Sequence, residues 1–172
     1  PFIYQGQEIG MTNVKFDSID QYNDVADKNM YRIEREEGVP HEEIMEIIWA
    51  SSRDNSRTPM QWSSKANAGF TTGTPWLGVN KNYKDINVEK QLQDERSILH
   101  FYKMMIKLKK ENQVCTYGTY DLILDDHPQI FAYTRTLADD KVVVLTNLSE
   151  KEAEIEEPLD FTVSQELLLA NY

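Results

Sequence analysis

The chain has 172 residues, of which 40% are apolar and 27% charged, a composition typical of a globular protein. Its formal net charge of −11 opposes binding to phosphate backbones or anionic lipid, so we expect neither a nucleic-acid nor a membrane partner. No apolar run reaches the roughly 18 to 20 residues that span a bilayer, and Cys115 is the only cysteine, which excludes an intrachain disulfide and is consistent with a cytoplasmic location.

The first half of the chain is expected to contain two helices among loops. Pro1–Gln5 is apolar and ends at Gly6, which predicts a short buried strand and a turn, and a start within an apolar run indicates a piece of a longer protein. Met11–Asn23 has no period and is expected to be a loop. The first helix is predicted over Asp27–Glu37, with Asp27 as its N-cap and Gly38 as its stop.

The second helix is predicted over Pro40–Ala50, with an apolar stripe made of Ile44, Ile47 and Ile48. The following segment, Ser51–Asp85, is rich in Gly, Pro, Thr and Asn and has little periodicity. A loop of this length inside a domain is usually functional or disordered. Its aromatic content, which includes Trp62 and Trp76, argues for order.

The second half changes from a helical to a strand period. Asp94–Asn112 has apolar residues at helical spacing, acids at its start and lysines at its end, and is predicted to be a helix. Three hairpin strands are then expected, at Tyr117–Leu124, Ile130–Thr136 and Lys141–Leu148, with further strands at Glu152–Ile155 and Ser164–Ala170. We therefore expect two units, residues 1–112 and residues 113–172.

The candidate binding residues lie in one run, Arg53 to Trp62 (RDNSRTPMQW). Arg presents a planar fork of N–H donors and Trp presents a face of the size of a pyranose ring, so the run suits a neutral polyhydroxylated ligand. The alternative is structural: Arg53 and Arg57 pair with acids to pin the loop, and Trp62 fills a core. Spacing alone favours the structural interpretation.

No metal or cofactor site is expected. The three histidines, His41, His100 and His127, are scattered and none has metal-ligand spacing with another His or with Cys. Gly6 and Gly10 do not form a phosphate-binding loop, because no Lys-Ser/Thr pair follows them.

Several motifs in order resemble the oligo-1,6-glucosidase and dextran glucosidase branch of glycoside hydrolase family 13. They are IYQGQEIGMTN at residues 3–13, RDNSRTPMQW at residues 53–62, AGF at residues 68–70, PW at residues 75–76 and YKDINV at residues 83–88. The resemblance covers nearly the whole chain. It implies an α+β fragment: the last strand and helices of a (β/α)8 barrel over residues 1–112, then a truncated antiparallel β-sandwich over residues 113–172.

The same resemblance implies retaining hydrolysis of α-glucosidic bonds by an Asp nucleophile and a Glu acid/base. The family's nucleophile motif, Gly-Phe-Arg-x-Asp, and its His-Asp pair do not occur in this sequence. We therefore expect no catalytic carboxylate in this chain, and expect the chain alone to be inactive.

Site residues are carried over at three positions. Arg53 matches the family arginine that contacts the glucose in the −1 subsite, whereas Asp54 and Arg57 are expected to support the loop. Two departures are Ala26, where the family usually has Glu, and Gln7, where Glu is common.

The expected substrate is a small α-1,6-linked oligosaccharide such as isomaltose, with no cofactor. Two alternatives stay open: a trehalose-6-phosphate hydrolase or sucrose isomerase of the same family, and a non-catalytic carbohydrate-binding or structural module. Exposed aromatic side chains in a groove of the β part would favour the last.

Overall fold

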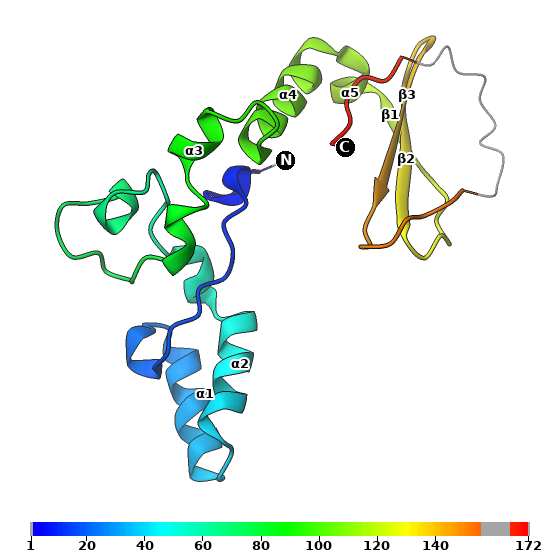
Figure 1. Cartoon of the computed structure of the whole chain (residues 1–172). Coiled ribbons are helices and arrows are strands. Elements are labelled where there is room, and N and C mark those ends of the chain that lie inside the picture. Colours follow the sequence, from blue (N-terminus) through cyan, green and yellow to red (C-terminus); the bar gives the residue numbers. More distant parts are fainter. Residues whose placement is uncertain (1, 156–165, 172) are drawn as a thin grey trace. The chain divides into compact units, whose positions relative to one another are not determined.

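A computed structural model describes residues 2–155 and 166–171 of the chain (Figure 1). The chain divides into two compact units, Pro1–Tyr102 and Lys103–Tyr172, and each is described by itself. Helices and loops precede a three-stranded antiparallel sheet. The mixed α and β content and its order along the chain agree with the prediction.

The strand predicted at Pro1–Gln5 is wrong for the residues that the structure describes. Residues 2–4 have no regular structure and Phe2 is fully exposed, while Pro1 lies outside the described residues. A strand is stabilised by backbone hydrogen bonds to a neighbour, and the described strands pair only with one another. The turn predicted at Gly6 is confirmed, with φ at 91°, and it leads into a 3₁₀ helix, Gln7–Ile9.

Helix α1 (Val25–Glu36) begins before its predicted cap. The Asp24 carboxylate accepts a hydrogen bond from the N–H of Ala26 at 2.9 Å and caps the helix. The prediction of Asp27 as the cap is therefore wrong, because Asp27 lies inside the first turn. The predicted stop at Gly38 is confirmed, since its φ of 90° is a left-handed conformation that favours glycine.

Helix α2 (His41–Ser51) begins directly after Pro40, close to the prediction. Its fully buried apolar side chains are Ile44, Met45 and Ile48. The prediction that Ile47 belongs to this stripe is wrong, because Ile47 is 52% exposed. Met45 takes its place, since positions 44, 45 and 48 share one face of a helix.

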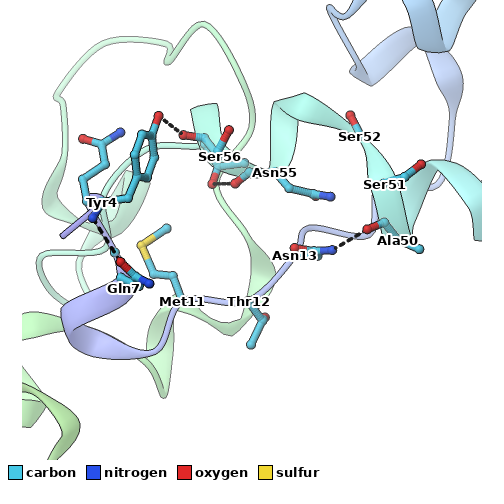
Figure 2. A pocket seen from close by; sticks show the side chains of 13 residues that line it. Tyr4, Gln7, Met11, Thr12, Asn13, Ala50, Ser51, Ser52, Asn55 and Ser56 are labelled. Atoms are coloured by element: carbon cyan, nitrogen blue, oxygen red, sulfur yellow. Dashed lines mark hydrogen bonds between the residues drawn. The ribbon is translucent and has the colours of Figure 1, made fainter. Parts of the chain in front are cut away.

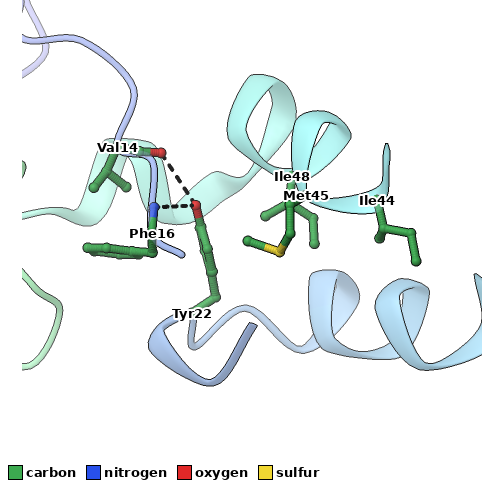
Figure 3. Packing of buried hydrophobic residues seen from close by; sticks show 6 residues of the cluster. All are labelled: Val14, Phe16, Tyr22, Ile44, Met45 and Ile48. Atoms are coloured by element: carbon green, nitrogen blue, oxygen red, sulfur yellow. Dashed lines mark hydrogen bonds between the residues drawn. The ribbon is translucent and has the colours of Figure 1, made fainter. Parts of the chain in front are cut away.

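The core of the first unit joins helix α2 to the loop before helix α1 (Figure 3). Phe16 and Tyr22 from this loop meet edge to face, with ring centroids 5.1 Å apart. The Tyr22 hydroxyl donates a hydrogen bond to the carbonyl of Val14 at 3.3 Å and accepts one from the N–H of Phe16 at 3.4 Å. The predicted loop is thus packed on helix α2 through its own buried side chains.

The long segment predicted as a loop contains short 3₁₀ helices, at Arg53–Arg57, Ala66–Gly69 and Lys81–Lys84. Side-chain amides fix it in place: Asn80 donates to the carbonyls of Thr12 and Asn13 at 3.1 and 3.2 Å. Helix α3 (Val88–Leu92) follows the segment and was not predicted, because its five residues are too few to show a helical period in the sequence.

Helix α4 (Ile98–Glu111) begins later than predicted, because the acids Asp94 and Glu95 lie before its first turn. The Ser97 hydroxyl accepts a hydrogen bond from the N–H of His100 at 3.3 Å. The predicted apolar stripe of helix α4 is largely exposed to solvent; the side chain of Met105, for example, is 46% exposed. A short helix α5 (Gln113–Tyr117), not predicted, follows it.

The sheet has the strand order β1-β2-β3 and confirms the three predicted hairpin strands. They are β1 (Thr119–Ile123), β2 (Ile130–Leu137) and β3 (Asp140–Asn147). Helix α5 packs against β2 and β3, and the buried side chains of β2 are Ile130, Ala132 and Thr134.

Two further strands were predicted after β3, and the structure describes only one of the two segments completely. The strand predicted at Glu152–Ile155 is wrong, because these residues are irregular. The strand predicted at Ser164–Ala170 lies partly outside the described residues, and residues 166–170 form no strand. The part of the chain that the structure describes therefore has no further strand after β3.

Candidate functional site

Arg53 lies at the start of the 3₁₀ helix Arg53–Arg57, directly after helix α2. Its Nε and Nη2 donate to the two carboxylate oxygens of Asp24, at 2.6 and 2.7 Å. This is a bidentate ion pair, in which the planar guanidinium and the carboxylate fix each other's orientation. The Asp24 side chain is 1% exposed whereas that of Arg53 is 65% exposed, so the guanidinium is anchored from the protein side and open to solvent on the other.

Arg57 and Asp54 complete the cluster from the same 3₁₀ helix. Arg57 Nη1 lies 3.1 Å from both Asp24 Oδ2 and Asp54 Oδ1. Asp54 is fully buried, and its other oxygen accepts hydrogen bonds from the N–H groups of Asn23 and Asp24, at 2.6 and 3.0 Å. The structure therefore brings the three residues predicted from sequence together around Asp24, a residue that was not predicted to belong to the site.

The charges of this cluster balance. The hydrogen bond from Arg53 holds the pKa of Asp24 far below its usual range; burial opposes this shift, and hydrogen bonds from Ala26 and Arg57 add to it. In return, Asp24 raises the pKa of Arg53 above its ordinary value. Nearby Asp27 and Asp54 act on Arg53 in the same direction, so a ligand at Arg53 meets hydrogen-bond donors whose charge is compensated by acids.

The remaining donors of Arg53 define what the site can bind. A guanidinium carries five N–H groups. Two of them are used by Asp24, the one acceptor that this side chain bonds within the described ranges. The three others, two on Nη1 and one on Nη2, are available to ligand oxygens. Such a set can donate to two adjacent hydroxyls of a sugar, and it attracts a phosphate less strongly than an unpaired guanidinium would.

A pocket adjoins this turn (Figure 2). It is lined by residues from the N-terminal segment, among them Tyr4, Gln7 and Asn13, and by residues after helix α2, among them Asn55 and Ser56. The Tyr4 hydroxyl donates to the carbonyl of Ser56 at 3.0 Å, and Asn13 donates to the carbonyl of Ala50 at 3.1 Å. Ser56 in turn donates to the carbonyl of Arg53 at 2.9 Å, which ties the pocket wall to the turn that carries Arg53.

The tryptophans divide between core and surface. Trp49 packs against the core and donates its indole N–H to the carbonyl of Phe16 at 2.9 Å. Trp62 and Trp76 are 50% and 70% exposed. The structural alternative is therefore confirmed for Arg53 and Arg57, which pair with acids, and wrong for Trp62, which does not fill a core.

The histidines have local partners. His41 Nδ1 lies 2.8 Å from the Tyr31 hydroxyl, His100 Nδ1 lies 3.0 Å from Ser97 Oγ, and His127 Nδ1 accepts from the N–H groups of Gln129 and Ile130. Among the described residues, no group of three or more His, Cys, Asp or Glu side chains has the arrangement of a metal site. Within the same residues, none of the helices combines the length and hydropathy that a bilayer crossing requires.

Residues 1–118 match the family described as "Alpha amylase, catalytic domain". The chain belongs to this family, glycoside hydrolase family 13, as its sequence motifs indicated. The match ends one residue before β1.

The chain is similar to proteins of several named activities. It is 52% identical over 175 residues to an oligo-1,6-glucosidase from Parageobacillus thermoglucosidasius, matching 100% of this chain and 31% of that protein. The crystal structure of a trehalose-6-phosphate hydrolase from Bacillus licheniformis superposes with a TM-score of 0.90 and 52% identity, over 95% of this chain and 30% of that one. The crystal structure of a mutant isomaltulose synthase from Erwinia rhapontici in complex with sucrose superposes with a TM-score of 0.79 and 44% identity. The match covers 88% of this chain and 27% of that one. The chain thus spans about a third of the length of these relatives.

Proposed function

We propose that the chain is part of an α-glucosidase that hydrolyses α-1,6-glucosidic bonds of isomaltose and short isomaltooligosaccharides with retention of configuration. The support is the 52% identity to oligo-1,6-glucosidases over the whole chain. In the complete protein, residues 1–112 form the end of a (β/α)8 barrel and residues 113–172 form part of an antiparallel β-sandwich. The sheet β1-β2-β3 is one layer of that sandwich.

The catalytic carboxylates lie outside this chain in our proposal. Retaining hydrolysis uses two carboxyl groups about 5 Å apart, one as nucleophile and one as acid/base. The sequence contains neither a Gly-Phe-Arg-x-Asp run nor a His-Asp pair. The acids nearest to the candidate site, Asp24 and Asp54, are buried and ion-paired with arginines, which is unsuited to a nucleophile. The 172-residue chain alone should release no p-nitrophenol from its α-glucoside, and turnover by pure chain would contradict the proposal.

Arg53 is the residue that contacts the sugar. The observation that carries this role is its guanidinium, held by Asp24 and 65% exposed, with three N–H groups directed away from the ion pair. Asp54 and Arg57 support the turn. In the complete protein we expect R53A to lower kcat/KM by about 10²-fold, because a hydrogen bond from a charged donor that strengthens in the transition state is lost. An unchanged kcat/KM would remove Arg53 from the binding site.

Substrate choice is tested with the complete protein and three substrates: isomaltose, trehalose 6-phosphate and sucrose. We expect glucose release from isomaltose, and the α-anomer as the first product by NMR. Cleavage of trehalose 6-phosphate in preference to isomaltose would instead assign the activity of the Bacillus licheniformis relative. Conversion of sucrose to an isomer without net hydrolysis would assign that of the isomaltulose synthases.

One observation favours a second function, sugar binding by the sheet. Tyr120, Tyr133 and Phe131 form a row on one face, with ring centroids 5.3 and 5.7 Å apart. Tyr120 and Phe131 are 50% and 42% exposed. Aromatic faces of this kind suit pyranose rings. Retardation of the chain in a gel that contains dextran, lost in Y120A but kept in Y117A, would support this function; equal mobility with and without dextran would exclude it.

A further inference from the structure

We infer that Asp24 is the positioning residue for Arg53: it sets the orientation in which the guanidinium meets the sugar, without contacting the sugar itself. The inference rests on the proposed role of Arg53. Asp24 contributes both carboxylate oxygens to the guanidinium, at 2.6 and 2.7 Å, and its own side chain is 1% exposed. A flexible Arg side chain is thereby reduced to one orientation before a ligand arrives.

Asp24 is itself fixed from three directions. As the N-cap of helix α1 it accepts a hydrogen bond from the N–H of Ala26 at 2.9 Å. Its own N–H is held by Asp54 at 3.0 Å, and Arg57 Nη1 lies 3.1 Å from its Oδ2. A carboxylate that is tethered through its backbone, its helix and a second cation has little freedom to rotate. The start of helix α1 fixes Asp24, and the bidentate ion pair in turn fixes the orientation of Arg53.

The pair also selects the kind of ligand atom. Because Asp24 neutralises Arg53, the free edge of the guanidinium donates hydrogen bonds without offering a net positive charge. Neutral hydroxyl oxygens are suited to this edge, and a phosphate gains less there than at an unpaired arginine. If Asp24 loses its charge, Arg53 gains both rotational freedom and a net charge, and the fit to a neutral sugar is weakened in two ways.

Asp24→Asn separates positioning from helix capping. Asn is as good an N-cap as Asp, so helix α1 keeps its start. The amide has one oxygen and no charge, so the bidentate pair with Arg53 is broken. The matched control is E36Q, which removes a carboxylate from the same helix where it forms an exposed ion pair with Arg32, with side chains 65% and 61% exposed.

The experiment is a double-mutant cycle in the complete protein, with kcat and KM measured on p-nitrophenyl α-glucoside for wild type, E36Q, D24N, R53A and D24N/R53A. We expect D24N to lower kcat/KM about tenfold to a hundredfold, as for a misplaced binding group, and E36Q to leave it unchanged. The decisive expectation is non-additivity: D24N added to R53A lowers kcat/KM no further. A purely structural role would not produce this pattern.

Each other outcome is informative. If R53A lowers kcat/KM and D24N does not, the inference is overturned while the proposed sugar contact stands. If D24N lowers kcat/KM equally with and without Arg53, Asp24 acts on the loop as a whole and the inference is again overturned. If R53A has no effect, both the inference and the proposed role of Arg53 fail.

Discussion

Asp54 accepts a hydrogen bond from the backbone N–H of Asp24 at 3.0 Å, which joins the turn after helix α2 to the start of helix α1. The two carboxylates share Arg57, which lies 3.1 Å from each. Asp54 therefore acts on the main chain while Asp24 acts on Arg53. The fold of the first unit and the orientation of the candidate binding residue depend on the same small set of charges.

Asp54→Ala should destabilise the first unit by about 2 to 3 kcal/mol, because it leaves the backbone N–H groups of Asn23 and Asp24 without their acceptor and Arg57 without one partner. Urea unfolding of the chain followed by tryptophan fluorescence measures this, since the three tryptophans all lie in the first unit. The control is D17A, which removes an ion pair to Lys81 with side chains 80% and 78% exposed and should change the midpoint little. Equal midpoints for D54A and D17A would contradict the prediction.

Tyr22→Phe should cost about 1 to 2 kcal/mol without changing the fold. The ring still packs against Phe16, but the buried carbonyl of Val14 loses its donor and the N–H of Phe16 its acceptor. The same urea titration measures the loss. Tyr117→Phe is the matched control, because Tyr117 is 74% exposed and no packing depends on its hydroxyl in the described residues. A stability of Y22F equal to wild type would show that these two bonds contribute nothing net.

Gly118→Ala should destabilise the junction of helix α5 and strand β1. A Cβ at this position would lie 2.6 Å from the carbonyl oxygen of Val114 and 3.0 Å from backbone atoms of Thr136, and backbone moves less readily than a side chain. We expect a loss of about 1 to 3 kcal/mol, measured as a lower melting temperature by circular dichroism. Gly73→Ala is the control, because its nearest neighbour, a Thr71 side-chain oxygen, would lie at an ordinary 3.7 Å. An unchanged melting temperature for G118A would mean that the strand start relaxes freely.

Local patterns in the sequence were sufficient to predict the helices α1, α2 and α4 and the three hairpin strands. Each has a period or a stop signal that operates over a few residues, such as Gly38 after helix α1. Errors arose where two local signals competed. Ile47 and Met45 are both apolar, and only the direction of the core decides which is buried. Asp94 and Ser97 are both good caps, and the helix begins after the one whose hydroxyl reaches the N–H of His100.

The candidate site was predictable in part for a different reason. The run from Arg53 to Arg57 is local, so its two arginines and Asp54 were visible together. Asp24 lies 29 residues before Arg53, and no short pattern links them. The numbers of charged residues could have indicated it: two arginines in a turn with one acid leave one guanidinium without a partner, so a second acid is expected from elsewhere in the chain. The strand predicted at Pro1–Gln5 is not formed by residues 2–5, because a strand needs a neighbour and no described strand pairs with these residues.

The acid stability of the first unit should depend on Asp24. Its pKa is lowered in the folded chain, chiefly by the hydrogen bond from Arg53, so the folded state holds the carboxylate ionised where the unfolded chain would bind a proton. This contribution is fully present above the ordinary aspartate pKa of about 4 and is lost as the pH falls below it. Among the neighbouring charges, Arg57 favours the ionised form.

The measurement is the urea midpoint of wild type and D24N at several pH values from 6 down to about 3. D24N cannot titrate at this position, so its midpoint should fall less steeply than that of wild type below about pH 4, and the two curves should converge in acid. The double variant D24N/R53A should show the same shallow slope as D24N, since the lowered pKa requires the carboxylate. Parallel curves for wild type and D24N would mean that the pKa of Asp24 is not lowered on folding, and that the ion pair with Arg53 is too weakly held to fix the guanidinium.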